Sequence, residues 1–190
     1  MRTATVKIKG MSSYSQSQAL KSEKGKSESY HDFEDRVWVE RMHLDSDDNV
    51  IIPIDCITQG MSTSASYLGK TGELAKKGQS TWAENIRCGI VLTKSPCIGK
   101  KSDAKEEWVY CHANGKRGPG TRVWRKFPMF YDWSTTMVIT ILDDSIPNEV
   151  FEKVIRAFGL FNGIGRHRPQ NGGYHGRFDV ISCEITENPT

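Results

Sequence analysis

The chain has 190 residues, a length typical of one domain that carries an insertion and buries a sizeable core without disulfide or metal support. Its 26 Lys and Arg against 23 Asp and Glu give a formal net charge of +3 and a pI near 8.6, which excludes a histone-like polycation. Mean hydropathy is only −0.53, but 5 Trp, 6 Tyr and 7 Phe exclude a disordered chain, so the composition indicates a soluble, loop-rich globular domain.

Neither a membrane segment nor a metal site is evident in the sequence. No apolar run approaches the ~20 residues that span a bilayer, and residues 1–10 alternate instead of forming a signal peptide. Five scattered cysteines without a CxxC pair indicate a reduced, cytoplasmic protein. Cys97, Cys111 and His112 match no standard zinc spacing, so we predict no metal and no cofactor.

The first quarter of the chain predicts a strand, a loop, a helix and a short strand. Apolar and polar residues alternate over 2–9, as in a half-buried strand, whereas the serine-rich residues 11–29 indicate a mobile surface loop. A helix is expected to begin at Ser29, a suitable N-cap, and to run toward His43. Residues 49–54 form a short apolar run that Pro53 confines to a sheet edge or a strand end.

The next segments predict a helix and a second strand. Residues 56–69 have apolar residues at helical spacing, with Gly69 where the residue after a helix is expected. The alternation of Ile86, Cys88, Ile90 and Leu92 predicts a strand.

Residues 94–126 predict a protruding basic β-hairpin inserted in the domain. They hold nine Lys or Arg against three acids, and two alternating segments flank the glycine-rich NGKRGPG. No acid occurs in 108–126, so we expect its cations to lack an internal partner. An ordinary solvated hairpin is the alternative. The candidate nucleic-acid contacts of the arm are Lys116, Arg117, Arg122, Arg125 and Lys126.

The last third repeats the order strand, helix, loop, strand. Residues 136–141 alternate as a strand, residues 147–158 carry an amphipathic stripe closed by Gly159, and residues 177–185 form the closing strand, with a one-residue slip near 180 that predicts a β-bulge. Two such halves predict an α+β, ferredoxin-like fold, an antiparallel sheet with helices on one face.

The segment 161–178, FNGIGRHRPQNGGYHGRF, is rich in glycine and arginine and contains no acid. Glycines let backbone N–H groups approach a phosphate, arginines bind phosphate in bidentate fashion, and Tyr174 can stack on a base. It is neither a Walker loop nor a Rossmann turn, because no GK[ST] follows and a helix precedes it. A flexible loop with solvated arginines is the alternative to a nucleic-acid site. Its candidate contacts are Arg166, His167, Arg168, Tyr174, His175 and Arg177.

A helix followed by GIGRHRPQNGGYHGRF and a closing strand resembles the C-terminal glycine-rich loop of the RAMP superfamily, ferredoxin-like (RRM/RAMP-type) proteins that bind RNA in CRISPR effector complexes and process CRISPR transcripts. NVIIPIDCITQGMSTSASYL is similar to another element of that family, with Ile52 and Pro53 in register, and the inserted arm resembles the thumb of its backbone subunits. The resemblance implies one RAMP-like domain over 1–190 and self-assembly along a bound strand.

The opening KGMSSYSQS and the GIGRxRPxNGG loop also look like proteins of phage early regions, which implies a bacterial or phage-infected cell. Tyr14 and Gln16 of this opening are further candidate contacts.

Together these features favour non-enzymatic binding of single-stranded DNA or RNA in a replication, recombination or CRISPR-related setting. One alternative is a protein–protein module that mimics a CRISPR backbone subunit and inhibits its assembly. A second is a metal-independent endoribonuclease that uses His167 and His175, because histidine exchanges protons near pH 7. We assign no catalytic residue, since the same histidines are equally well explained as phosphate contacts among arginines.

Overall fold

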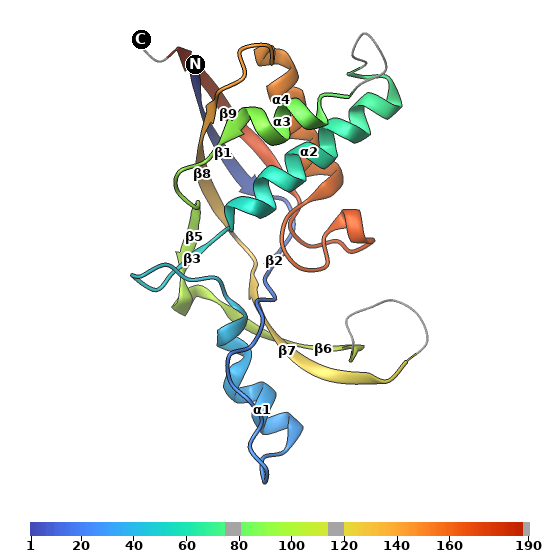
Figure 1. The fold of residues 1–190 in the computed structure, drawn as a ribbon. Helices are drawn as coiled ribbons and strands as arrows, with labels where there is room; N and C mark the ends of the chain where they lie inside the picture. Colours follow the sequence, from blue (N-terminus) through green and yellow to red (C-terminus); the bar gives the residue numbers. More distant parts are fainter. Residues whose placement is uncertain (75–80, 114–119, 188–190) are drawn as a thin grey trace.

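The computed structural model describes residues 1–74, 81–113 and 120–187. Its central element is a four-stranded antiparallel sheet in the order β4 (Ile90–Val91), β8 (Ser134–Ile141), β1 (Arg2–Gly10) and β9 (Phe178–Glu187). Three helices, α2 (Ile54–Thr71), α3 (Ala83–Gly89) and α4 (Asn148–Ala157), lie on one face of this sheet (Figure 1). The strand order and the one-sided helices are those of a ferredoxin-like fold, which confirms the predicted fold class.

Alternation in the strands builds the core. Ala4, Val6 and Ile8 of β1 point toward the helices and are at most 2% exposed. The bulge predicted in β9 is present: Lys7 pairs with Ser182 but Ile8 pairs with Val180, so Ile181 is skipped. Because of this extra residue, both halves of β9 turn apolar side chains toward the helices.

The apolar stripe of α4 is buried as predicted, but neither long helix ends at its predicted glycine. After α4 the chain continues in a wider π-helical turn, Phe158–Asn162, so Phe158 reaches the core and packs edge-on against Phe178. The second helix, α2, runs past Gly69 and ends at Gly72, whose φ of +84° is the left-handed conformation that glycine adopts readily.

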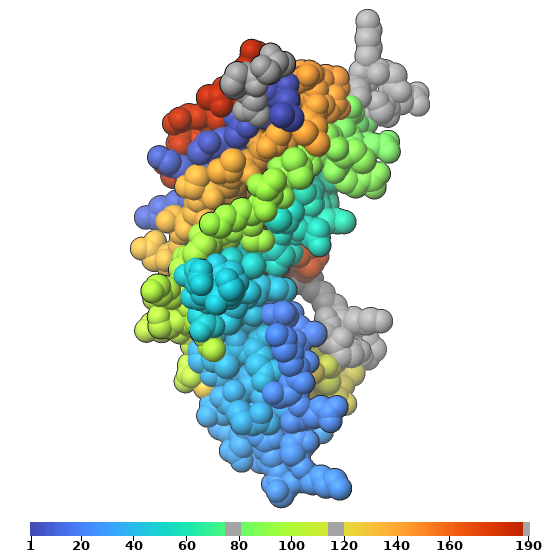
Figure 2. All heavy atoms as spheres, turned by 60° about the vertical axis from the view of Figure 1, so that its left-hand side comes forward, coloured from blue at the N-terminus to red at the C-terminus, as the bar shows by residue number. Residues whose placement is uncertain are grey.

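Two insertions between the core elements form a second lobe. It contains the helix α1 (Tyr30–Val37) and a three-stranded sheet in the order β2 (Tyr14–Ser15), β7 (Arg122–Phe130) and β6 (Lys105–His112). A separate two-stranded sheet pairs β3 (Asn49–Ile51) with β5 (Cys97–Lys100). The hairpin of β6 and β7 confirms the predicted arm, and β3 ends at Ile51, two residues before Pro53, as one of the two predicted alternatives requires. The lobe makes the molecule elongated, with α1 at one end (Figures 1 and 2).

The serine-rich residues 11–29 do not form a detached surface loop, contrary to the prediction. Tyr14, Ser15 and Gln16 are at most 2% exposed, because β2 pairs with β7 and the Gln16 amide bonds the Tyr14 hydroxyl and the Ile51 carbonyl. A short polar segment can thus be buried when most of its polar atoms find partners within the protein, although the buried Ser15 hydroxyl has none among the described residues.

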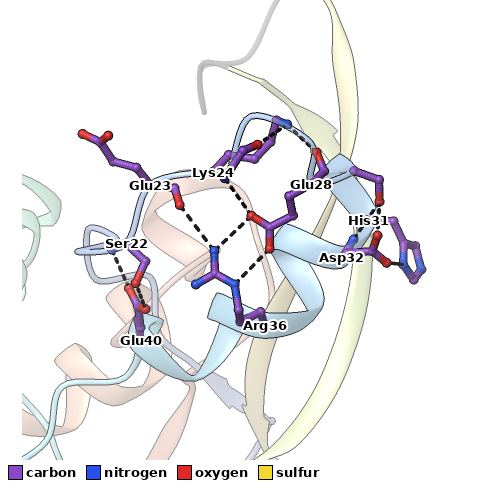
Figure 3. A network of polar contacts seen from close by, with 10 residues as sticks. Ser22, Glu23, Lys24, Glu28, His31, Asp32, Arg36 and Glu40 are labelled. Atoms are coloured by element: carbon purple, nitrogen blue, oxygen red, sulfur yellow. Dashed lines mark hydrogen bonds and ion pairs between the residues drawn. The ribbon is translucent and has the colours of Figure 1, made fainter.

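Farther along the same segment, polar contacts tie it to the helix that follows (Figure 3). The Arg36 guanidinium lies 2.9 Å from the Glu28 carboxylate, and the Glu40 carboxylate accepts backbone N–H groups of Lys21 and Ser22. Ser29 caps α1 as predicted, accepting from the Asp32 N–H at 3.1 Å. The helix ends at Val37, earlier than predicted, and is continued by a 3-10 turn, Trp38–Arg41.

The prediction of a strand over residues 86–92 is wrong for the first half of that segment. Residues 83–89 are helical, and only residues 90 and 91 pair with β8. Ile86 and Ile90 are buried and four residues apart, whereas Cys88 between them is exposed. Burial in residues 83–90 therefore recurs at the spacing of a helix. The alternation of apolar residues that predicted a strand does not correspond to alternating burial.

Candidate nucleic-acid interface

The structure brings the glycine-rich loop and the basic hairpin to the two sides of one hollow of about 880 Å³, which we call the arginine groove. These segments are separated by about 30 residues of the chain but meet beside the second lobe. The groove is lined by Ser17, Glu107, Val109, Tyr110, Cys111, His112, Arg122, Arg125, Phe127, Arg166, His167, Asn171, Tyr174 and His175.

Glycines shape the loop wall by allowing it to pack tightly on itself. Gly176 has a φ of +74°, and a Cβ at this residue would lie 1.8 Å from the Ile164 carbonyl oxygen. The backbone N–H groups of Gly173, His175 and Gly176 all donate to carbonyls within the protein. The prediction that the loop glycines present N–H groups to a phosphate is therefore wrong for Gly173 and Gly176, because their donors are already used.

The loop instead presents side chains. His167 has a φ of +54°, and its ring lies against those of Tyr174 and His175. Tyr174 is 57% exposed at the groove, a position suited to stacking on a base.

His175 is the buried member of this cluster. Its Nδ1 lies 2.8 Å from the Ser13 hydroxyl. Burial, together with the charges of Arg166 and His167, lowers the pKa of His175 to about 4. His175 is therefore neutral at pH 7 and serves as a packed hydrogen-bonding residue of the wall.

Arg166 is the cation best placed for a ligand. Its guanidinium carbon lies 3.6 Å from the centre of the Phe127 ring, so the aromatic face fixes the orientation of the guanidinium. One of its terminal nitrogens is buried and has no hydrogen-bond partner in the protein. Burial lowers the pKa of Arg166, yet an arginine stays charged at neutral pH. A desolvated cation with an unused donor favours binding of an anion such as phosphate.

The hairpin supplies the opposite wall. Arg122 is exposed, and Arg125 is half-buried with a terminal nitrogen that donates to the Ala113 carbonyl at 2.7 Å. Tyr110 pairs with Trp124 across the hairpin, their ring centres are 5.2 Å apart, and both side chains are more than half exposed. Arginines beside exposed aromatic rings are typical of proteins that bind single strands.

The other predicted contacts lie elsewhere. Arg168 donates to Gln170 and to the Gly165 carbonyl, and Arg177 donates to the Leu160 carbonyl, so both brace the loop. The buried Tyr14 and Gln16 cannot meet a ligand. Lys116 and Arg117 are outside the described residues.

Lys126 is also not a contact residue. It is 3% exposed and its ammonium lies 2.5 Å from Asp35 and 2.6 Å from Glu106. The prediction that the cations of 108–126 lack an internal partner is therefore wrong at this residue, because α1 and β6 supply the carboxylates.

The predictions from the sequence did not include two important groove residues, Tyr110 and Phe127. Tyr110 carried a usable signal, since an aromatic residue in a basic, alternating hairpin can stack on a base. Phe127 carried none, because its contact with Arg166 joins residues 39 positions apart in the chain.

The open face of the four-stranded sheet is a poorer platform than the groove. Its exposed positions include Lys7, Lys9, Val138 and Ile181, and no aromatic side chain projects from it in the described parts of the four strands. Base stacking on this face, as expected if the sheet itself were the platform, has no ring to use.

Within the described residues there is no group of three or more His, Cys, Asp or Glu side chains arranged to hold a metal ion. No helix in those same parts of the chain is both long and apolar enough to cross a membrane.

Comparison with known proteins gives a match in structure only. No protein-family model and no curated protein sequence matches the chain. Among solved structures, it is similar to a chain of the cryo-EM structure of the type III-B Cmr-β complex bound to cognate target RNA, with a TM-score of 0.54 and 14% identity. The match covers 97% of this chain and 60% of that one, so the present chain spans about three fifths of the length of its structural neighbour. At this identity the likeness concerns the fold.

Proposed function

We propose that the protein binds single-stranded nucleic acid in the arginine groove and does not cleave it. The observation that carries this proposal is Arg166, a groove-lining cation that is fixed on the Phe127 ring and has one buried terminal nitrogen without a partner among the described residues. Arg122 and Arg125 provide further positive charge, and Tyr110 and Tyr174 offer faces for unpaired bases.

The similar fold of a chain in an RNA-bound Cmr-β complex supports the proposal and favours RNA and a CRISPR-related setting. Stacking requires bases that are not paired, so the groove should prefer a single strand to a duplex. The neutral His175 favours binding over cleavage, because a histidine with a pKa of about 4 is a poor proton donor at pH 7.

The experiment is a fluorescence-anisotropy titration at low salt with single-stranded RNA, single-stranded DNA and both duplexes. We expect the single strands to bind, RNA more tightly. Arg166→Gln should weaken binding by about tenfold or more, as for loss of a charge-assisted hydrogen bond. Arg87→Gln is the matched control, since Arg87 is an exposed arginine outside the groove.

Failure of the wild-type protein to bind any of the four ligands would overturn the proposal. Because Arg166 also packs on Phe127, urea unfolding of Arg166→Gln separates lost binding from lost folding, and Tyr174→Ala tests the groove at an exposed side chain. Cleavage of labelled RNA in EDTA, abolished in His167→Ala, would replace the binding role with a ribonuclease.

Self-assembly along the strand is the second part of the proposal. The hairpin of β6 and β7 extends to one side of the second lobe (Figure 1), which supports a role in contacting a neighbouring subunit. Deleting 115–120 should reduce cooperativity on long strands more than affinity for a strand one subunit long. Equal effects on both ligands would show that the arm contacts only the strand of its own subunit.

A further inference from the structure

A second hollow, of about 810 Å³, lies between α1 and the hairpin, and we call it the aromatic pocket. Its lining is mostly apolar and includes rings from both elements, Tyr30, His31 and Phe33 from α1 and Trp108 and Trp124 from the hairpin. The rings of His31 and Trp108 are stacked, with centres 4.6 Å apart and planes at 19°. Tyr30 is 78% exposed and Trp124 is 59% exposed, so flat ring surfaces are open to a ligand.

The aromatic pocket and the arginine groove share part of their walls on the hairpin. Arg125 lines both hollows. Tyr110, which lines the groove, lies against Trp124, which lines the pocket. A strand bound in the groove would therefore extend over this pair of rings to place a base in the pocket.

The chemistry of the pocket indicates its occupant. Open faces of several aromatic rings suit a flat, aromatic group better than a branched aliphatic one. A cation at the boundary with the groove suits an occupant attached to an anion. A nucleobase on a phosphate backbone has both properties.

We propose that the aromatic pocket receives one unstacked base of the strand whose phosphates lie in the arginine groove. This inference rests on the proposed function and adds a base-binding site to it. The strand is held at Arg166 and Arg125, and one base leaves its neighbours to stack beside Tyr30 and Trp124.

The test is a double-mutant cycle between the pocket and the ligand. The probe is a labelled oligouridylate of about 12 nucleotides, a length within the range of single-strand sites, and a set of copies with one abasic residue at successive positions. Tyr30→Ala is the main variant because it is highly exposed and lines only the pocket; Trp124→Ala is the second. Tyr131→Ala is the control, an exposed tyrosine that lines neither hollow.

We expect each pocket variant to weaken binding of the intact strand by about tenfold, the effect of losing one stacked base. One abasic position should weaken wild-type binding by a similar factor and cause no further loss in Tyr30→Ala. Wild-type affinity of both pocket variants, or losses that multiply at every abasic position, would overturn the inference and leave the pocket available to a protein partner.

The two proposals fail in different ways. If the protein does not bind the intact strand, or binds it equally well with Arg166→Gln, the groove is not the binding site. If binding depends on Arg166 but not on Tyr30 or Trp124, the groove binds the strand and the pocket holds no base.

Discussion

At the scale of single residues, the glycine-rich loop depends on close backbone approaches. Gly176 and Gly72 both have positive φ, but a Cβ at Gly72 would meet nothing within 4 Å, whereas one at Gly176 would collide with backbone. Gly72→Ala should therefore cost about 1 kcal/mol, the penalty of the left-handed conformation alone. Gly176→Ala should cost at least about 2 kcal/mol more, because the loop must also shift. Urea unfolding of the two variants measures this difference, and equal losses would contradict it.

His175 should make stability depend on pH. Its pKa is about 4 in the folded protein against an ordinary 6.5, so folding disfavours its protonation. The free energy of unfolding should therefore be unaffected by the protonation of His175 above about pH 6.5. As the pH falls from 6.5 to 4, protonation of His175 in the unfolded state should lower it by up to about 3 kcal/mol. His175→Asn should flatten the fall in unfolding free energy over this range.

The control for this experiment is His31→Asn, since the His31 side chain is 72% exposed. Its pH profile should follow that of the wild-type protein. A His175→Asn profile that also follows the wild type would show that the buried imidazole is not responsible for the pH dependence.

At the scale of elements, Lys126 joins α1 to the hairpin. Burial lowers its pKa, but the hydrogen bonds that the ammonium donates to the Asp35 and Glu106 carboxylates outweigh this and raise the pKa above its ordinary value. Both carboxylates are more than half exposed, so water can replace the ammonium. Lys126→Met should thus cost only about 1 kcal/mol, less than for a fully buried pair.

Lys126→Ala should cost about 3 kcal/mol, because the side chain is 3% exposed, its ammonium lies 5.6 Å from the centres of the Trp38 and Trp108 rings, and its removal would leave a void. Urea unfolding of both variants checks the ranking. A larger loss in the methionine variant than in the alanine variant would mean that charge, and not packing, dominates this junction.

The elements differ in how far their sequences could predict them. The alternation of β1 and the slip in β9 were visible because each strand has one buried face, and a slip in register changes that face. The segment 83–89 was misread because seven residues are too few to separate the two periods. The burial of Gln16 depends on partners from Ile51 and His43, so its own segment carried no signal.

In the candidate site, too, some features could be predicted from the local sequence and others depend on distant residues. The loop was detectable from its composition, since glycine, arginine and aromatic residues occur together in 161–178. The composition could not show that Arg168 and Arg177 brace the loop while Arg166 faces the groove. That separation depends on which carbonyls lie nearby after folding.

At the scale of the whole molecule, a net charge of +3 means that binding must depend on local charge. Three arginines line the groove, so the logarithm of the single-strand affinity should fall with the logarithm of salt concentration with a slope of about −2. Titrations at several salt concentrations measure this slope. A value steeper by more than about one would show that further cations, such as Lys116 and Arg117, also contact phosphates.

The pairing of β1 with both β8 and β9 has a consequence for synthesis on the ribosome. The first strand emerges long before either partner, and at about 5–20 residues per second it waits on the order of 10 s for residues 178–187. Until β8 emerges, its alternating apolar face has no paired strand of the described sheet to join, which exposes the nascent chain to aggregation. The central sheet therefore closes only after nearly all of the described chain has been translated, and chaperones that hold nascent chains should favour its folding.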